Sequence, residues 1–318
     1  MARYIGRRLL IAIPLLLIIT ILCFMLMHLA PYDAIDAMTS PKMSADTVAL
    51  IKAKYGYDQP IYVQYVRWLG GLLSGNFGYS IVTKQSIGSE LAVRIPNTII
   101  LVLPSYLVAY VLAIVLGLFA GMHHGSRADK IIDGIASIGI ALPSFWFSMM
   151  LILIFGYSLK LLPIVGMSTV GDGTLIDLIR HYILPFVTLV VAFLPDNLRY
   201  VRSSTITQSS EDYVTVQKAF GSTHNEIMFH HICKNVLTPI LTKLGMAMPL
   251  LITGAVITES VFSWPGVGPY FITAIKGMDY PVVMIVLVLS ATFVILGNLL
   301  ADVLCAMVDP RIRQGEGH

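Results

Sequence analysis

The chain has 318 residues, of which 56% are hydrophobic and 12% are charged. Ordinary soluble domains carry roughly 25% charged residues, so this composition indicates a membrane protein. The 21 Lys and Arg residues nearly balance the 18 Asp and Glu residues, which leaves a net charge of +3 and argues against nucleic-acid binding. The 3 cysteines form no Cys-x-x-Cys pair, so neither a disulfide framework nor a zinc site is expected.

Apolar runs that suit membrane spans recur along the chain. A spanning helix needs about 20 apolar residues, because hydrocarbon offers the backbone no hydrogen-bond partner. Six runs are assigned as spans, at residues 9–30, 98–120, 131–159, 183–198, 244–262 and 282–307. The first lacks an Ala-x-Ala cleavage pattern, so we interpret it as a retained helix. The sequence therefore predicts an all-α integral membrane protein with about six transmembrane helices.

Basic residues predict the orientation of these spans, since Lys and Arg resist translocation. Arg3, Arg7 and Arg8 place the N-terminus in the cytoplasm. With six spans, the second and fourth loops and the C-terminal tail are then also cytoplasmic, and each of them is basic. Both termini are therefore expected on the cytoplasmic side.

The long stretch between the first two spans, residues 31–97, is expected outside the membrane as a folded insertion. It contains a helical pattern at residues 46–55 after a cap at Ser44 or Asp46, and an aromatic-rich amphipathic run at residues 61–73. Its rings suit the lipid boundary or, equally, packing of the insertion onto the spans. We thus expect a first span with its N-terminus (1–30), the insertion (31–97), a core of five further spans (98–307) and a tail (308–318).

Catalytic patterns are missing from the sequence. It has no phosphate-binding loop, no His-Glu-x-x-His and no Gly-x-Ser-x-Gly, so we expect no catalytic residue, cofactor or metal on this chain. Acidic residues in or near spans remain candidates for function, because burying them in hydrocarbon is costly. Asp196 and Glu259 could line a polar path; equally, Asp196 could pair with Arg199 or Arg202. Asp302 is interpreted as structural.

Glycines and prolines interrupt the predicted spans. Gly117 and Gly121 form a Gly-x-x-x-Gly pattern that favours close helix packing. Five prolines permit kinks of the kind a moving helix bundle uses: Pro104, Pro143, Pro185, Pro195 and Pro249.

The most unusual segment of the predicted cytoplasmic face is residues 211–221. Acidic residues open it, apolar residues follow, and Gly221 is suited to a left-handed helix cap. A second amphipathic stretch occupies residues 225–237. We expect a helix, a turn and a helix that present a docking surface, the alternative being a hairpin that lies along the membrane.

Several blocks of sequence resemble a known family. They are Pro143-Ser144-Phe145-Trp146, Asp212-Tyr213-Val214 with Ala219 and Gly221, Lys234-Asn235 with Pro239, Glu259-Ser260-Val261-Phe262-Ser263-Trp264-Pro265-Gly266-Val267-Gly268, Asp279-Tyr280-Pro281-Val282 and Asp309-Pro310-Arg311. In these blocks, and over nearly its whole length, the chain resembles the membrane-spanning permease of ABC importers for dipeptides, oligopeptides and nickel, in the first-permease branch.

This resemblance implies a type I ABC importer fold in the cytoplasmic membrane, with a coupling segment at residues 211–239. The implied ATPase-coupling residues are Asp212, Tyr213, Val216, Ala219, Phe220 and Gly221. The candidate residues of the translocation path are Ser144, Phe145, Trp146, Asp196, Asn197 and Glu259. The implied partners are a second permease, two ATPases that carry ATP and Mg²⁺, and an extracytoplasmic binding protein.

The resemblance implies peptide uptake, with the chain as half of the pathway and no covalent chemistry of its own. Nickel, metal complexes or glutathione are alternative cargoes for the same fold. Two rival functions are an intramembrane enzyme that uses Glu259 and Asp196 as acid and base, and a solitary channel or carrier.

Overall fold

The computed structural model describes residues 2–29, 43–246 and 255–308. These residues form helices joined by short connections, and they contain one isolated β-bridge between Tyr79 and Ser86 and no strand. The predicted all-α class is confirmed within this described part of the chain.

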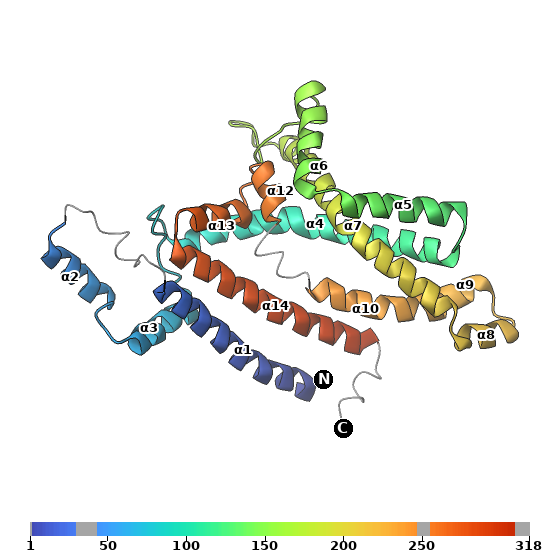
Figure 1. The fold of residues 1–318 in the computed structure, drawn as a ribbon, viewed down its shortest axis with the longest axis horizontal. Coiled ribbons are helices and arrows are strands. Elements are labelled where there is room, and N and C mark those ends of the chain that lie inside the picture. Colours follow the sequence, from blue (N-terminus) through green and yellow to red (C-terminus); the bar gives the residue numbers. More distant parts are fainter. Residues whose placement is uncertain (1, 30–42, 247–254, 309–318) are drawn as a thin grey trace.

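Four long apolar helices dominate the structure (Figure 1): α1 (Ala2–His28), α4 (Ile87–Met122), α7 (Leu175–Ser209) and α14 (Tyr280–Val308). Their apolar stretches, of 19, 36, 35 and 22 residues, are each long enough to cross a membrane. They confirm the predicted first, second, fourth and sixth spans, and α4 and α7 extend beyond the predicted ends. The chain is therefore a multi-pass membrane protein.

The predicted third span, residues 131–159, is broken and is not one straight helix. It consists of α5 (Arg127–Ala141) and α6 (Ser144–Leu151), which continues as a π-helical stretch η1 (Ile152–Ser158). The two halves meet at 97°. Pro143 explains the break, because it lacks an N–H and excludes the helical conformation from the preceding residue, and Leu142 is extended with ψ 116°.

The predicted fifth span, residues 244–262, is described only in part. Its first residues form the end of α10 (Cys233–Met246), and its last residues contain α12 (Val256–Val261). Residues 247–254, between these helices, are not described, so the count of six spans stays a prediction. The side chain of Asp302 also lies outside the described part of the structure, so its structural role stays a prediction.

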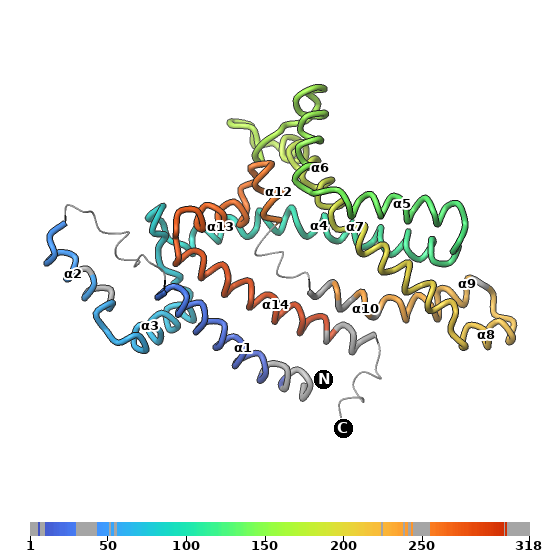
Figure 2. The backbone as a smooth tube through the Cα atoms, in the orientation of Figure 1, coloured from blue at the N-terminus to red at the C-terminus, as the bar shows by residue number. Residues whose placement is uncertain are grey.

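The predicted insertion contains two short helices, α2 (Ala45–Tyr55) and α3 (Ile61–Leu73). Ser44 caps α2 by accepting a hydrogen bond from the Thr47 N–H at 3.3 Å, so the cap is Ser44 and not Asp46. Figure 2 shows α3 at the end of α1 that is distant from the N-terminus. There Tyr65 and Trp68 pack against Phe24 of α1, so at least these rings join the insertion to the helix bundle.

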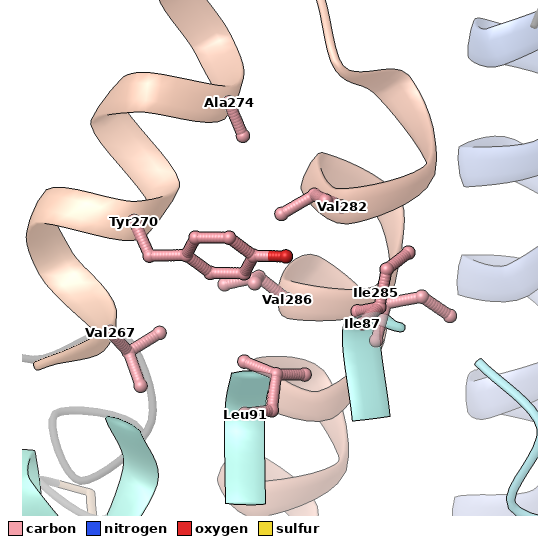
Figure 3. Packing of buried hydrophobic residues seen from close by; sticks show 8 residues of the cluster. All are labelled: Ile87, Leu91, Val267, Tyr270, Ala274, Val282, Ile285 and Val286. Carbon is pink, nitrogen blue, oxygen red and sulfur yellow. The ribbon is translucent and has the colours of Figure 1, made fainter. Parts of the chain in front are cut away.

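Helix α13 (Val267–Lys276) packs between the start of α4 and the start of α14 (Figure 3). The buried side chains of this cluster are Ile87 and Leu91 from α4, Val267, Tyr270 and Ala274 from α13, and Val282, Ile285 and Val286 from α14. More than a hundred residues of chain separate α4 from α13 and α14, so the cluster joins segments that are distant in the sequence.

The Gly-x-x-x-Gly pattern brings α4 close to α7. A Cβ atom on Gly117 would lie 2.6 Å from the Cβ of Val201, and one on Gly121 would similarly meet Thr205. Only glycine leaves room for this approach. The expected packing role of Gly117 and Gly121 is confirmed.

Candidate functional site

A short helical hairpin follows α7 and forms the first part of the candidate site. It consists of α8 (Asp212–Ala219), a turn, α9 (His224–Glu226) and a π-helical stretch η2 (Ile227–Ile232), and we call residues 212–232 the α8 hairpin. Asp212 lies in the first turn of α8, where a negative charge is favourable. The structure confirms a helix, a turn and a helix here, although the second helical run continues through α10 to Met246, beyond the predicted end at residue 237.

Gly221 ends α8 in the left-handed conformation, with φ +83°. The Gly221 N–H donates to the Lys218 carbonyl at 3.0 Å, and the Ser222 N–H donates to the Gln217 carbonyl at 3.1 Å. This pair of bonds is the Schellman arrangement, which satisfies the last carbonyls of a helix. The predicted role of Gly221 as a left-handed cap is confirmed.

A capping box starts the second helical run. The Thr223 N–H donates to the Glu226 carboxylate at 2.7 Å, and the Glu226 N–H donates back to the Thr223 hydroxyl at 3.3 Å. The bond from the Thr223 N–H, with a second from its hydroxyl, lowers the pKa of Glu226 below its ordinary value of 4.5. The Thr-x-x-Glu spacing carried this signal in the sequence, and the sequence analysis missed it.

The α8 hairpin is fastened to the helix bundle by apolar packing and a polar clasp. Val214 is buried in a cluster with Leu118 of α4, Val201 of α7, and Ile227 and Ile232 of η2.

The polar clasp is centred on the Gln208 side-chain oxygen near the end of α7. It accepts hydrogen bonds from the Tyr213 hydroxyl at 3.1 Å and from the Asn235 amide at 2.9 Å. The sequence analysis did not single out Gln208. Gln208 thus links the end of α7 to both α8 and α10.

The opposite side of α8 is open and forms what we call the docking face: Asp212, Val216, Ala219 and Phe220, all exposed. Val216 is 50% exposed and Phe220 is 82% exposed. These positions follow helical spacing, so they share one side of α8, while Val214 points to the bundle. An exposed Phe one helical turn from an exposed Val forms an apolar patch of the kind that contacts another protein or the membrane.

A network of charged side chains joins α5 to α7. Asp129 of α5 is buried and accepts hydrogen bonds from the Arg202 side chain of α7, at 2.9 Å for one nitrogen, and from the Gly125 N–H at 2.9 Å. Arg199 lies 3.8 Å from Asp133 of α5.

The alternative in which Asp196 pairs with Arg199 or Arg202 is wrong. Asp196 pairs instead with Lys243 of α10 at 3.4 Å, since both arginines face the acidic residues of α5.

The candidate path residues fall into two groups. Ser144, Phe145 and Trp146 begin α6, and both aromatic side chains are exposed. Helix α6 packs against α7 and α12, so these residues lie on elements adjoining the one that carries Glu259. Asp196 and Asn197 lie further along α7, where Asp196 is exposed and the Asn197 amide donates to the Phe193 carbonyl at 2.8 Å. Asp196 and Glu259 have different partners, Lys243 and the Gly268 N–H, and the described residues place no bond between the two carboxylates.

Glu259 lies inside the protein and braces a turn. Its side chain is 0% exposed, and Oε2 accepts a hydrogen bond from the Gly268 N–H at 2.8 Å. The Thr98 hydroxyl accepts the Val267 N–H at 2.9 Å, so α4 holds the same turn. A side chain on Gly266 would collide with Glu259 and Thr98. The Trp-Pro-Gly-Val-Gly block therefore has a packing role in this structure.

Asp279 is a structural carboxylate that the sequence analysis did not single out beyond its block. It is buried at the start of α14 and accepts hydrogen bonds from the Ser80 hydroxyl, from the Ile81 N–H at 3.1 Å and from the Val82 N–H at 3.3 Å. The end of the insertion is thus tied to the last long helix. No pattern near Asp279 announces partners so distant in the chain.

The fold and the site define an all-α membrane protein in which a helical hairpin at one end of the bundle presents an open apolar face. Comparison of sequences narrows this class. The profile of the family described as binding-protein-dependent transport system inner membrane component matches residues 113–314, and the profile of its N-terminal part matches residues 1–102. The chain belongs to this family.

Several relatives are similar to this protein over nearly the whole chain. The oligopeptide transport system permease protein AppB of Bacillus subtilis (strain 168) is 41% identical over 315 residues, which cover 98% of this chain and 99% of that protein. The di/tripeptide transport system permease protein DppB of Pseudomonas aeruginosa is 34% identical over 337 residues, with 98% and 99% covered. The glutathione transport system permease protein GsiC of Salmonella typhi is 34% identical over 313 residues, again with 98% and 99% covered.

Proposed function

We propose that this chain is the permease subunit of an ATP-driven importer of oligopeptides or dipeptides, and that it forms half of the transmembrane pathway. The likeness to oligopeptide and di/tripeptide permeases over 98% of the chain carries this proposal. The docking face of α8 supports it, because a permease without its own nucleotide site needs a surface that receives the motion of an ATPase.

The coupling residues act through the α8 hairpin. Phe220 and Val216 enter a groove on the partner ATPase, Asp212 and Ala219 border them, and Gly221 sets the exit of the chain from that groove. Tyr213 and Val214 transmit the displacement, because they connect α8 to Gln208 of α7 and to the cluster with α4. ATP and Mg²⁺ are bound by the ATPase partners, and this chain binds no cofactor.

The remaining partners follow from the family. A second, homologous permease completes the pathway. Two ATPases bind on the cytoplasmic side of the membrane, where both termini of this chain lie. An extracytoplasmic binding protein delivers the peptide on the opposite side, where the insertion lies. The proposed residues in or next to the path remain Ser144, Phe145, Trp146, Asp196, Asn197 and Glu259. Glu259, which is buried, acts by holding the turn beside the path. Alternating rotation of the two permeases moves the cargo inward.

Co-purification from the native membrane tests this proposal first. The tagged chain, solubilised gently, is expected to bring with it a homologous permease, ATPase subunits and a binding protein, all identified by mass spectrometry. Recovery of the chain alone, under conditions that keep a known ABC importer intact, would move the weight to a solitary channel or an intramembrane enzyme.

Cargo is tested with the recovered complex in proteoliposomes. ATP-dependent uptake of tri-alanine is the expected result. The likeness to GsiC makes glutathione a second candidate cargo, and uptake of glutathione without uptake of tri-alanine would replace the peptide proposal.

A further inference from the structure

Asp196 is a charged residue with a largely open side chain on a helix that crosses the membrane. It lies within α7, which is long and apolar enough to span, and its side chain is 82% exposed. A carboxylate at such a position avoids hydrocarbon and faces water or protein, because its transfer into lipid costs several kcal/mol. Its open side therefore faces water or another protein and not lipid.

Lys243 of α10 holds this carboxylate from one side. Its ammonium nitrogen lies 3.4 Å from the Asp196 carboxylate and 4.2 Å from the centroid of the Tyr200 ring. Lys243 is thus engaged twice, by an ion pair and by a cation–π contact. It is also less open than its partner, at 33% exposed.

Aromatic side chains continue the wall around this pair. Tyr106 of α4 packs edge-on against Phe193 of α7, with ring centroids 5.2 Å apart, and lies beside Tyr110. The Tyr106 hydroxyl donates to the Lys243 carbonyl at 3.5 Å. Helices α4, α7 and α10 therefore converge on one site with a carboxylate that has free accepting capacity and aromatic rings nearby.

The two arginines that follow Asp196 on α7 make different contacts. Arg202 is bound to the buried Asp129, and Arg199 lies beside Asp133, so both arginines join α7 to α5. Asp196 points to a different helix and keeps most of its surface.

We propose that Asp196 lines the translocation cavity and that its carboxylate accepts hydrogen bonds from the ammonium groups of the passing peptide. Lys243 is the positioning residue that orients this carboxylate. This inference rests on the proposed function, since peptides are the cargo that it requires. Every free peptide carries an α-ammonium group, so one open carboxylate serves cargoes of many sequences. The aromatic rings beside it suit side chains of varied type.

Thiol accessibility tests whether Asp196 faces the cavity. Asp196→Cys is made in a chain whose own cysteines are replaced by serine, assembled with its partners in proteoliposomes and exposed to a membrane-impermeant sulfonated maleimide. The matched control is Val111→Cys: Val111 is 59% exposed, in an apolar stripe of α4, and lies near the level of Asp196 because Gly117 packs against Val201. Labelling at 196 about tenfold faster than at 111 is expected, because only position 196 meets water. Equal labelling would overturn the proposal.

Uptake tests the binding of ammonium. Asp196→Asn keeps the shape and removes the charge, and it is expected to lower uptake of tri-alanine at limiting concentration about tenfold, mainly through KM. Asp196→Glu restores the charge and is expected to recover most of the rate. Asp133→Asn removes an ion pair on the α5 side and is expected to leave uptake within about twofold.

The outcomes separate this inference from the proposed function. If the unaltered importer takes up tri-alanine but Asp196→Asn is fully active, only the inference about Asp196 is overturned. The same holds if Asp133→Asn loses as much uptake as Asp196→Asn. Failure of Asp196→Glu to recover uptake also overturns it, because shape and not charge would then matter. Absence of tri-alanine uptake by the unaltered importer overturns the proposed function and this inference with it.

Discussion

Replacement of Gly221 by two different residues distinguishes the effect of backbone conformation at the end of α8 from the effect of side-chain size. Gly221 has φ +83°, where an ordinary residue costs about 1–2 kcal/mol. A Cβ atom there meets no other atom within 4 Å, so the structure itself has room for a side chain. Asn tolerates the left-handed conformation, whereas Leu, of similar size and branching, does not. The two variants therefore differ mainly in the conformational cost.

That cost predicts the size of the effect. A penalty of 1–2 kcal/mol reduces the population of the capped conformation by a factor of about 5–30. If the ATPase receives only the capped hairpin, Gly221→Leu lowers ATP-driven tri-alanine uptake about tenfold and Gly221→Asn lowers it no more than about twofold. The two Schellman hydrogen bonds of Gly221 and Ser222 are the contacts at stake.

The assay measures initial uptake and stimulated ATP hydrolysis in proteoliposomes that contain equal amounts of assembled importer. Equal loss in both variants would refute the reasoning, because bulk in the ATPase groove and not the backbone would then be decisive. Unchanged uptake in both variants would refute the coupling role of the cap altogether.

Three further predictions concern stability. Val214→Ala leaves a cavity at a buried site and is expected to lower the free energy of unfolding by about 2 kcal/mol, whereas Val216→Ala on the exposed side of α8 changes it by no more than about 0.5 kcal/mol. Chemical denaturation of the purified chain measures both values. Equal losses would contradict the assignment of Val214 to the buried side of α8 and Val216 to its exposed side. Asp279→Ala leaves the donors of the Ser80 loop without their carboxylate, so limited proteolysis near residues 80–86 should accelerate, and unchanged cleavage would show that the tie is dispensable. The pKa of Glu226 is below 4.5 in the folded chain, so its carboxylate stabilises the fold fully above pH 4.5, and this stabilisation is lost as the pH falls through the lower folded pKa. The difference in melting temperature between the unaltered protein and Glu226→Ala should therefore shrink as the pH falls over that range. A constant difference would contradict this linkage.

Local features of the fold were predictable from the sequence because they depend on neighbouring residues. Apolar length identifies α1, α4, α7 and α14, and the caps at Ser44 and Gly221 depend on residues only a few positions away. Even the break in the third span has a local cause in Pro143, although the 97° angle depends on the packing of α6 against other elements.

Pairings between distant segments were not predictable from one sequence. Asp279 is 198 residues from Ile81, and Arg202 is 73 residues from Asp129. Sequence spacing carries no information about which helix faces which, so the only ion-pair partners considered for Asp196 were the nearest arginines and not Lys243. The burial of Glu259 is of the same kind, because the turn that covers it includes Thr98 of a different helix.

Photo-crosslinking from the docking face tests the coupling of this chain to an ATPase most directly. A photoreactive phenylalanine analogue at position 220 replaces a side chain that is 82% exposed, and the same analogue at position 111 probes a face expected to meet lipid. Irradiation of the assembled importer is predicted to join position 220 to an ATPase subunit, with no such product from position 111. An assembled importer that gives no ATPase adduct from position 220, or equal adducts from both positions, would contradict the account.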